Sequence, residues 1–266
     1  MTFIQLIILA IVQGLTEFIP VSSSAHLILA PLMVDSWGDQ GRAIDVAAHV
    51  GSLGAVMLYF RKDTANLIYG GVDAALLRKT ENAQLFWLLA VATAPLVVFG
   101  GILAVSGLAD TLRDPRVIGA SSIIFGVLLW IADRRPITQT TPPNGWRAVL
   151  WIGAAQALAA IPGTSRSGAT MTAARWLGFD REQSARFSML LAIPAIAASG
   201  LYETLKMISD GGEAPIGAAI LVAIFSFVAA LLAIDVFLKL TKRISFTPFV
   251  VYRIGLGLLL FALFSS

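Results

Sequence analysis

Six long apolar segments, separated by short polar connections, limit what this chain can fold into. They are rich in Leu, Ile, Val, Ala and Phe, and they cover residues 43–60, 84–105, 117–133, 187–207, 216–238 and 249–264. A helix that crosses a bilayer needs about 20 predominantly apolar residues. We therefore predict an all-α, polytopic integral membrane protein with six transmembrane helices.

The composition agrees with a membrane protein and excludes several other classes. Charged residues make up 13% of the chain, whereas a soluble domain carries about 25%. The net charge of +3 is explained by Lys and Arg that gather in cytoplasmic loops, so we expect no nucleic-acid partner. The chain has no Cys, which excludes disulfides, thiolate catalysis and Cys-ligated metals.

Two further apolar stretches, residues 1–42 and 147–184, are interrupted by Pro, Gly and clustered polar residues. Neither half of either stretch is long enough to cross a bilayer. We interpret each stretch as a re-entrant pair of short helices that enters and leaves the membrane by the same face. Non-helical backbone at this depth is tolerated only where protein or a watery cavity surrounds it.

The charge of the connections predicts their orientation. Basic residues gather in 61–83, 134–147 and 239–248, which we place in the cytoplasm by the positive-inside rule. The connection 208–215 has acidic residues and no Lys or Arg, so we place it outside. Alternation of the spans then puts both termini outside.

A short internal repeat relates the two interrupted stretches. Residues 19–24 (IPVSSS) align with residues 161–166 (IPGTSR) at an offset of 161 − 19 = 142 residues. Three predicted crossings separate the copies, so the copies have opposite orientation. We predict a single membrane domain, 1–266, built from inverted repeats at approximately 1–133 and 147–266, as in many transporters whose broken helices meet near the midplane.

The first polar cluster combines several chemical groups in one short segment. Gln13 and Glu17 are four residues apart and share a helix face. A buried carboxylate such as Glu17 costs about 2.5–3.5 kcal/mol on insertion scales, so it indicates function. Pro20 ends the helix, and His26 follows in the first turns of the next helix. Three hydroxyl side chains cap that next helix: Ser22, Ser23 and Ser24.

The second polar cluster has the composition of an anion-binding turn. Its glycines let the backbone approach a ligand, and its hydroxyls cap a helix whose first N–H groups favour an anion. Arg166 adds a planar, permanently charged fork that suits phosphate oxygens. The candidate binding residues of this turn are Gly163, Thr164, Ser165, Arg166, Ser167 and Gly168.

Each of these residues also has a plain structural interpretation. Serines at a helix start are more often caps than nucleophiles, and a lone His such as His26 is usually structural. Glu17 could serve only as the partner of Arg166. His49, which shares a helix face with Asp45 and Ser52, could line the cavity or pack against a neighbouring helix.

With these motifs the sequence resembles the undecaprenyl-diphosphate phosphatase family, whose members are tied to bacitracin resistance. The resemblance is carried by residues 13–26 (QGLTEFIPVSSSAH) and by the unbroken 162–168 (PGTSRSG), and a segment at 45–51 is also similar. It implies a bacterial inner-membrane enzyme that converts undecaprenyl diphosphate to the monophosphate carrier for cell-wall synthesis. It also implies a divalent cation, Mg²⁺ or Ca²⁺, and a site that faces the periplasm.

By motif position, Glu17, Ser23, His26 and Arg166 match the family's functional residues, with Glu17 as the metal ligand. Gln13 stands where many members have Glu, so one carboxylate is missing, although an amide oxygen can bind a hard cation. We assign catalysis to Glu17, Ser23 and His26. We assign substrate binding to Gln13, Ser22 and Ser24 together with the second turn.

The sequence leaves several alternatives open. The phosphoryl group could be attacked by His26, by Ser23 or by water. The rival function is a transporter or flippase of an anionic lipid, because broken helices in inverted repeats are typical of transporters. Lipid flipping could also accompany hydrolysis. Both a monomer and a homodimer are compatible with the sequence.

Overall fold

The computed structural model describes residues 2–23, 25–27, 29, 41–210 and 215–264, and within this part of the chain it is helical with no strand. The all-α prediction is confirmed. The helices are α1 (Phe3–Thr16), α3 (Arg42–Tyr59), α4 (Arg61–Ala75), α5 (Glu81–Ser106), α6 (Leu108–Thr111), α7 (Pro115–Asp133), α8 (Trp146–Ala157), η1 (Leu158–Ala160), α9 (Arg166–Trp176), α10 (Arg181–Ser209), α11 (Ile216–Thr241) and α12 (Thr247–Phe264).

Five of these helices, α5, α7, α10, α11 and α12, are long and apolar enough to cross a membrane. A sixth span is reached when α3 and α4 are counted together, with a bend of 98° between them. The predicted connection 61–83 therefore contains a helix that the sequence analysis did not expect. This helix, α4, packs against α5. It is too polar to stand out as an apolar segment in the sequence.

The apolar exterior fits a lipid environment. On α11 an exposed large apolar side chain recurs every four residues, which places a continuous stripe on one face of the helix: Ile220, Ile224, Val228, Leu232 and Val236. A soluble protein rarely exposes so large an apolar patch. Opposite this stripe, α11 buries Ile234 and Phe237 in the main core beside Phe18 and Met189.

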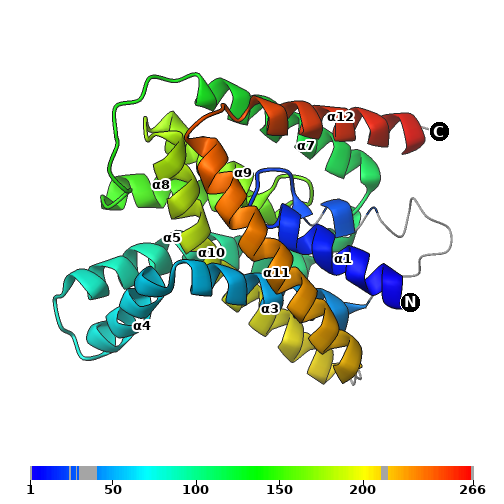
Figure 1. Ribbon diagram of the computed structural model, residues 1–266, viewed down its shortest axis with the longest axis horizontal. Helices are drawn as coiled ribbons and strands as arrows, with labels where there is room; N and C mark the ends of the chain where they lie inside the picture. The colour runs from blue at the N-terminus through cyan, green and yellow to red at the C-terminus, as the bar shows by residue number, and fades with distance from the viewer. Residues whose placement is uncertain (1, 24, 28, 30–40, 211–214, 265–266) are drawn as a thin grey trace.

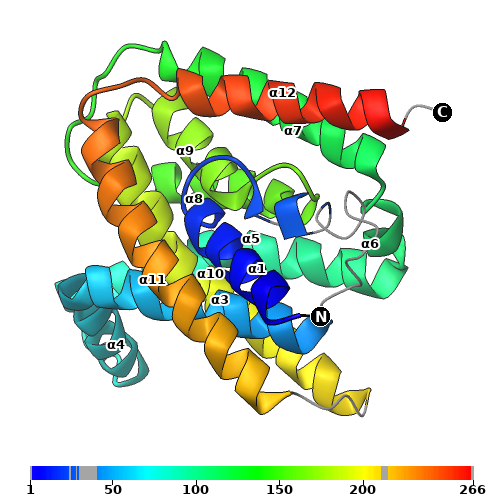
Figure 2. The ribbon, with the colours of Figure 1, turned by 45° about the vertical axis from the view of Figure 1, so that its right-hand side comes forward.

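The two interrupted stretches lie inside the bundle. In Figure 1, α7 and α12 run side by side along one edge, and α11 lies against α1 and α3. Figure 2 shows α1, α8 and α9 near the centre, and α9 contacts α7, α8 and α10. The second predicted pair is present as two helical segments joined by a turn at 161–165. In the first stretch, α1 is followed by a turn at 17–22 and by helical residues at 23, 25–27 and 29, and residues 30–40 lie outside the described residues.

Gly14 lets α1 approach α11 closely. A Cβ atom at Gly14 would stand 2.8 Å from the Cβ of Ala229 and 2.9 Å from the backbone nitrogen of Ala230. We expect Gly14→Val to lower the free energy of unfolding by about 1–3 kcal/mol, because the helices must separate to fit the side chain. Thermal unfolding in detergent checks this, with Gly100→Val as the control, since a Cβ at Gly100 meets nothing within 4 Å. Equal unfolding temperatures for the two variants would contradict the expected loss.

Candidate active site

Each of the two turns ends on a serine with an unusual backbone. Ser22 has φ of 75° and Ser165 has φ of 68°, in the left-handed region that non-glycine residues rarely adopt. In both turns the next residue, Ser23 or Arg166, begins a helical segment. Such strained residues cost about 1–3 kcal/mol and cluster at functional sites. The two turns thus share a strained entry into the helix that follows.

Glu17 is the centre of the site. It follows the last residue of α1, and its side chain is only 7% exposed. One carboxylate oxygen, Oε2, accepts hydrogen bonds from Ser23 Oγ at 2.7 Å and from Gln13 Nε2 at 2.9 Å. The other, Oε1, accepts from Arg166 Nη2 at 3.3 Å. The carboxylate therefore joins the first turn to the second.

His49 also reaches this carboxylate. Its Nε2 lies 3.9 Å from Glu17 Oε2. Its Nδ1 lies 2.8 Å from the backbone oxygen of Asp45, which can only accept, so Nδ1 donates. This geometry decides between the two interpretations that the sequence left open. His49 lines the site, whereas Ser52 packs against Ser226 on α11.

Arg166 is held from two sides and keeps donors for a ligand. Its Nη2 contacts Glu17, and its Nη1 donates to the backbone oxygen of Ser188 on α10 at 3.2 Å. A guanidinium has further N–H groups beyond these two bonds. Its side chain is 12% exposed, so those groups are within reach of an anion that enters the site.

The second turn is tied to the first and to α7. Ser167 Oγ donates to the backbone oxygen of Ile19 at 2.8 Å. Ser165 Oγ accepts from the Gly168 amide at 3.1 Å and so caps α9. Gly163 has φ of 87°, and a side chain there would collide with Ile118. The predicted residues of this turn are thus brought together. Thr164 among them is fully buried, and within the described ranges its hydroxyl has no hydrogen-bond partner.

Arg253 on α12 contacts the second turn, and it is not among the residues predicted from the sequence motifs. It is fully buried and donates to the backbone oxygens of Gly163 at 2.9 Å, Thr164 at 2.8 Å and Ser122 at 3.3 Å. In the described part of the chain it forms no ion pair. An arginine in the middle of an apolar span was the signal that could have found it.

We expect Arg253→Lys to raise KM for a diphosphate substrate about ten-fold. A point-like ammonium cannot hold three carbonyl oxygens as the guanidinium fork does, so the anion-binding turn loses its shape. Steady-state kinetics of purified protein check this. Arg243→Lys, at the exposed end of α11, is the control. An unchanged KM in a folded Arg253→Lys variant would contradict a role for this arginine in shaping the turn.

His26 lies apart from the Glu17 cluster. Its Nδ1 is 2.7 Å from the backbone oxygen of Ser22, and its Nε2 forms a short hydrogen bond with the hydroxyl of Tyr252 on α12. The rings are stacked, with centroids 5.7 Å apart and an angle of 8° between their planes. Among the described residues, no hydrogen bond or ion pair joins His26 to Glu17. The bond to Ser22, four residues back, turns the imidazole toward α12.

The remaining candidate residues are less central. The backbone oxygen of Ser22 accepts the hydrogen bond of His26, and Ser24 lies outside the described residues.

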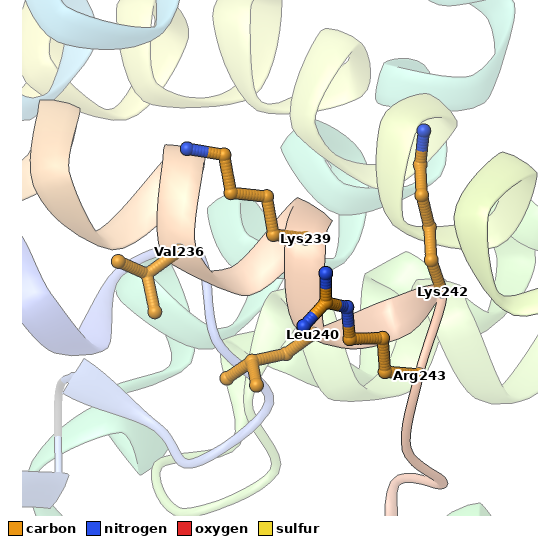
Figure 3. Close-up of a pocket in the computed structure, with 5 residues that line it drawn as sticks. All are labelled: Val236, Lys239, Leu240, Lys242 and Arg243. Carbon is orange, nitrogen blue, oxygen red and sulfur yellow. The ribbon is translucent and has the colours of Figure 1, made fainter.

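A cavity of about 290 Å³ near the end of α11 is lined by Val236, Lys239, Leu240, Lys242 and Arg243 (Figure 3). It contains none of the predicted site residues.

The oxygen atoms around Glu17 suit a hard divalent cation. Glu17 and Ser23 supply oxygens, and the buried Oε1 atom of Gln13 has no hydrogen-bond partner among the described residues. Within the described ranges, no group of three or more His, Asp or Glu side chains gathers to hold a metal. A cation here would therefore rest on Glu17, on neutral oxygens and on phosphate oxygens of a ligand.

Comparisons with known proteins agree over the whole chain. A family model described as bacitracin resistance protein BacA matches residues 6–259. A protein of Maricaulis maris (strain MCS10) named undecaprenyl-diphosphatase is 47% identical over 268 residues, which cover 99% of this chain and 100% of the relative. A protein of Jannaschia sp. (strain CCS1) with the same name is 45% identical, with 98% of each chain covered.

Proposed function

The chain belongs to the bacitracin resistance protein BacA family, and we propose that it hydrolyses undecaprenyl diphosphate to undecaprenyl phosphate and inorganic phosphate. The observation that carries the proposal is the Ser23 hydroxyl, which donates at 2.7 Å to a buried carboxylate that also contacts Arg166. In this proposal Ser23 is the nucleophile, Glu17 is the proton acceptor and the Arg166 guanidinium binds phosphate. All three lie together between apolar helices.

In the proposed complex the two turns bind the diphosphate while the isoprenoid tail lies among the spans. The unused N–H groups of Arg166 and the start of α9 hold phosphate oxygens. Arg253 stabilises the backbone of the second turn through its hydrogen bonds to the Gly163 and Thr164 oxygens. Stabilising charge on the transferring phosphoryl group is the main task in such reactions. A divalent cation held by Glu17 and Gln13 would supply further positive charge.

Ser23 is the nucleophile in our account. Its Oγ forms a bond to the terminal phosphorus, the bond from that phosphorus to the bridging oxygen breaks, and undecaprenyl phosphate leaves. The proton of Ser23 passes to Glu17 Oε2, which already accepts its hydrogen bond. Water then attacks the phosphoserine, inorganic phosphate leaves, and Ser23 regains its proton from Glu17. His26 is less suited to attack, because its Nε2 is engaged by Tyr252.

The cellular role follows from the product. The monophosphate is the carrier for cell-wall polysaccharide synthesis, so its recycling would explain bacitracin resistance. We propose that the protein lies in the bacterial inner membrane with its site open to the periplasm. The two turns, which meet through Ser167 and Ile19, support inverted repeats as the origin of the site.

Phosphate release in detergent tests the function directly. We expect the purified protein to release one phosphate from undecaprenyl diphosphate and to leave undecaprenyl phosphate intact. A chelator should lower the rate at least about ten-fold, and Mg²⁺ or Ca²⁺ should restore it. Without membrane compartments no flipping is measured. Absence of release with either cation would contradict hydrolysis and favour a flippase.

A further inference from the structure

The hydrogen bonds of His26 define its tautomer. The Ser22 backbone oxygen, 2.7 Å from Nδ1, can only accept, so Nδ1 carries a proton. In the neutral ring Nε2 then has a lone pair, and the hydroxyl of Tyr252 donates to it. Both nitrogens are thus assigned by their partners.

We propose that Tyr252 is a positioning residue for the reaction: it holds His26 with the proton on Nδ1 and the lone pair on Nε2. The stacked rings restrict rotation of the imidazole, and the hydroxyl selects its tautomer. The pair is 226 residues apart in the chain, so α12 sets the state of a side chain in the helical segment that follows the first turn. Nothing in the sequence motifs pointed to Tyr252.

The surroundings make this hydrogen bond effective. Tyr252 is 46% exposed on a face of α12 that also exposes Val251. The other exposed side chains on that face, Val251, Leu258 and Leu259, are apolar, so they do not compete for the hydroxyl. Arg253, the next residue, is fully buried on the second turn. Among the described residues, no carboxylate contacts either ring, so the tautomer is set by neutral groups.

The role in catalysis rests on the proposed function. The attacking water must lose a proton as its oxygen bonds to the phosphorus of phosphoserine. Nε2 of His26 takes that proton once the Tyr252 hydroxyl turns away, and the imidazolium later releases it to solvent. Ser23 regains its own proton from Glu17. An imidazole with the proton on Nε2 could not accept there, so loss of the Tyr252 hydroxyl slows this step.

The tautomer can be read without any activity assay. The chain has only two histidines, so ¹⁵N-histidine labelling gives two sets of ring signals, and His49→Gln assigns them. We expect His26 to show a protonated Nδ1 and an unprotonated, hydrogen-bonded Nε2. Tyr252→Phe keeps the stacked ring and removes the hydroxyl, so the Nε2 signal should shift. Tyr202→Phe, at 45% exposure and without a histidine partner, should leave both signals in place.

Kinetics provide the second readout. Tyr252→Phe should lower kcat about ten-fold or more with little change in KM, whereas Tyr202→Phe should match the wild type. A proton on Nε2 in the wild type, or a Tyr252→Phe variant with unchanged signals and unchanged kcat, would overturn the proposal. A second outcome is that the Nε2 signal shifts in Tyr252→Phe while the wild-type protein releases no phosphate. This outcome would overturn the proposed function and leave the Tyr252–His26 pairing intact.

Discussion

Replacing Glu17 with Gln is expected to lower kcat for phosphate release by about 10³-fold or more. The amide has the size of the carboxylate but cannot take the proton of Ser23, which now donates to Glu17 Oε2 at 2.7 Å. It also removes the negative charge beside Arg166 and the carboxylate that would hold a divalent cation in the proposed complex. Rates of phosphate release at saturating substrate measure the effect.

The division between kcat and KM distinguishes this role from a merely structural one. At saturating divalent cation, loss of the negative charge beside Arg166 should not raise KM, because repulsion of the anionic substrate decreases. Glu203→Gln, which changes an exposed carboxylate on α10, is the matched control. If a folded Glu17→Gln protein kept its kcat within a few-fold of the wild type, Glu17 would not be the proton acceptor.

Asp133→Ala should be the most destabilising single substitution that we foresee. The buried carboxylate of Asp133 accepts from Arg181 Nε at 2.7 Å, from Arg181 Nη2 at 3.2 Å and from the Phe246 amide at 3.0 Å. Its Oδ1 also lies 3.6 Å from Arg175, which is almost fully buried. Removal of one partner leaves a buried charge uncompensated and costs about 3–5 kcal/mol.

Thermal unfolding in detergent measures this loss. Asp133 joins the end of α7 to α9, α10 and the start of α12, so the variant should lose the packing that holds the second turn. Asp133→Asn keeps an oxygen for the Phe246 amide and should lie between the wild type and the alanine variant. Asp114→Ala removes a partly exposed aspartate that caps α7, which should cost only about 0.5–2 kcal/mol, and is the control. Similar unfolding temperatures for Asp114→Ala and Asp133→Ala would contradict this account.

Features that depend on neighbours in the sequence could be predicted. The apolar runs gave the spans, because one helix needs about 20 such residues. Pro20 and Gly163 marked the turns, since each restricts or frees the local backbone. The contact of Gln13 with Glu17 follows from their spacing of four residues, and the structure has their side chains 2.9 Å apart.

Features that depend on residues distant in the sequence could not be predicted from it. The positions of His49, Tyr252 and Arg253 in the site follow from the packing of α3 and α12, which no local pattern encodes. The sequence assigns His26 to catalysis together with Glu17, but the bond of His26 to Ser22 turns its imidazole toward α12. The 98° bend between α3 and α4 occurs at Phe60. Because this residue is neither Pro nor Gly, the local sequence does not predict the bend.

The inverted repeat stays a prediction, with a refined alignment. Ser22 and Ser165 share a left-handed backbone, and their offset is 165 − 22 = 143 residues. Gln13 and Gln156 are both fully buried, each with an amide oxygen that has no hydrogen-bond partner in the part of the chain that the structure describes, and their offset is 156 − 13 = 143. The sequence match alone gave 142. A shift of one residue places the strained serines of the two turns at equivalent positions.

The central claim is that Ser23 receives the phosphoryl group while Glu17 takes its proton. Acid quenching during turnover of undecaprenyl diphosphate, followed by mass spectrometry of the peptide that contains Ser23, tests it most directly. We expect a phosphoryl group on Ser23 in the wild type, none in Ser23→Ala, and phosphate release by Ser23→Ala no faster than by Glu17→Gln. A folded Ser23→Ala protein that releases phosphate at the wild-type rate would contradict it.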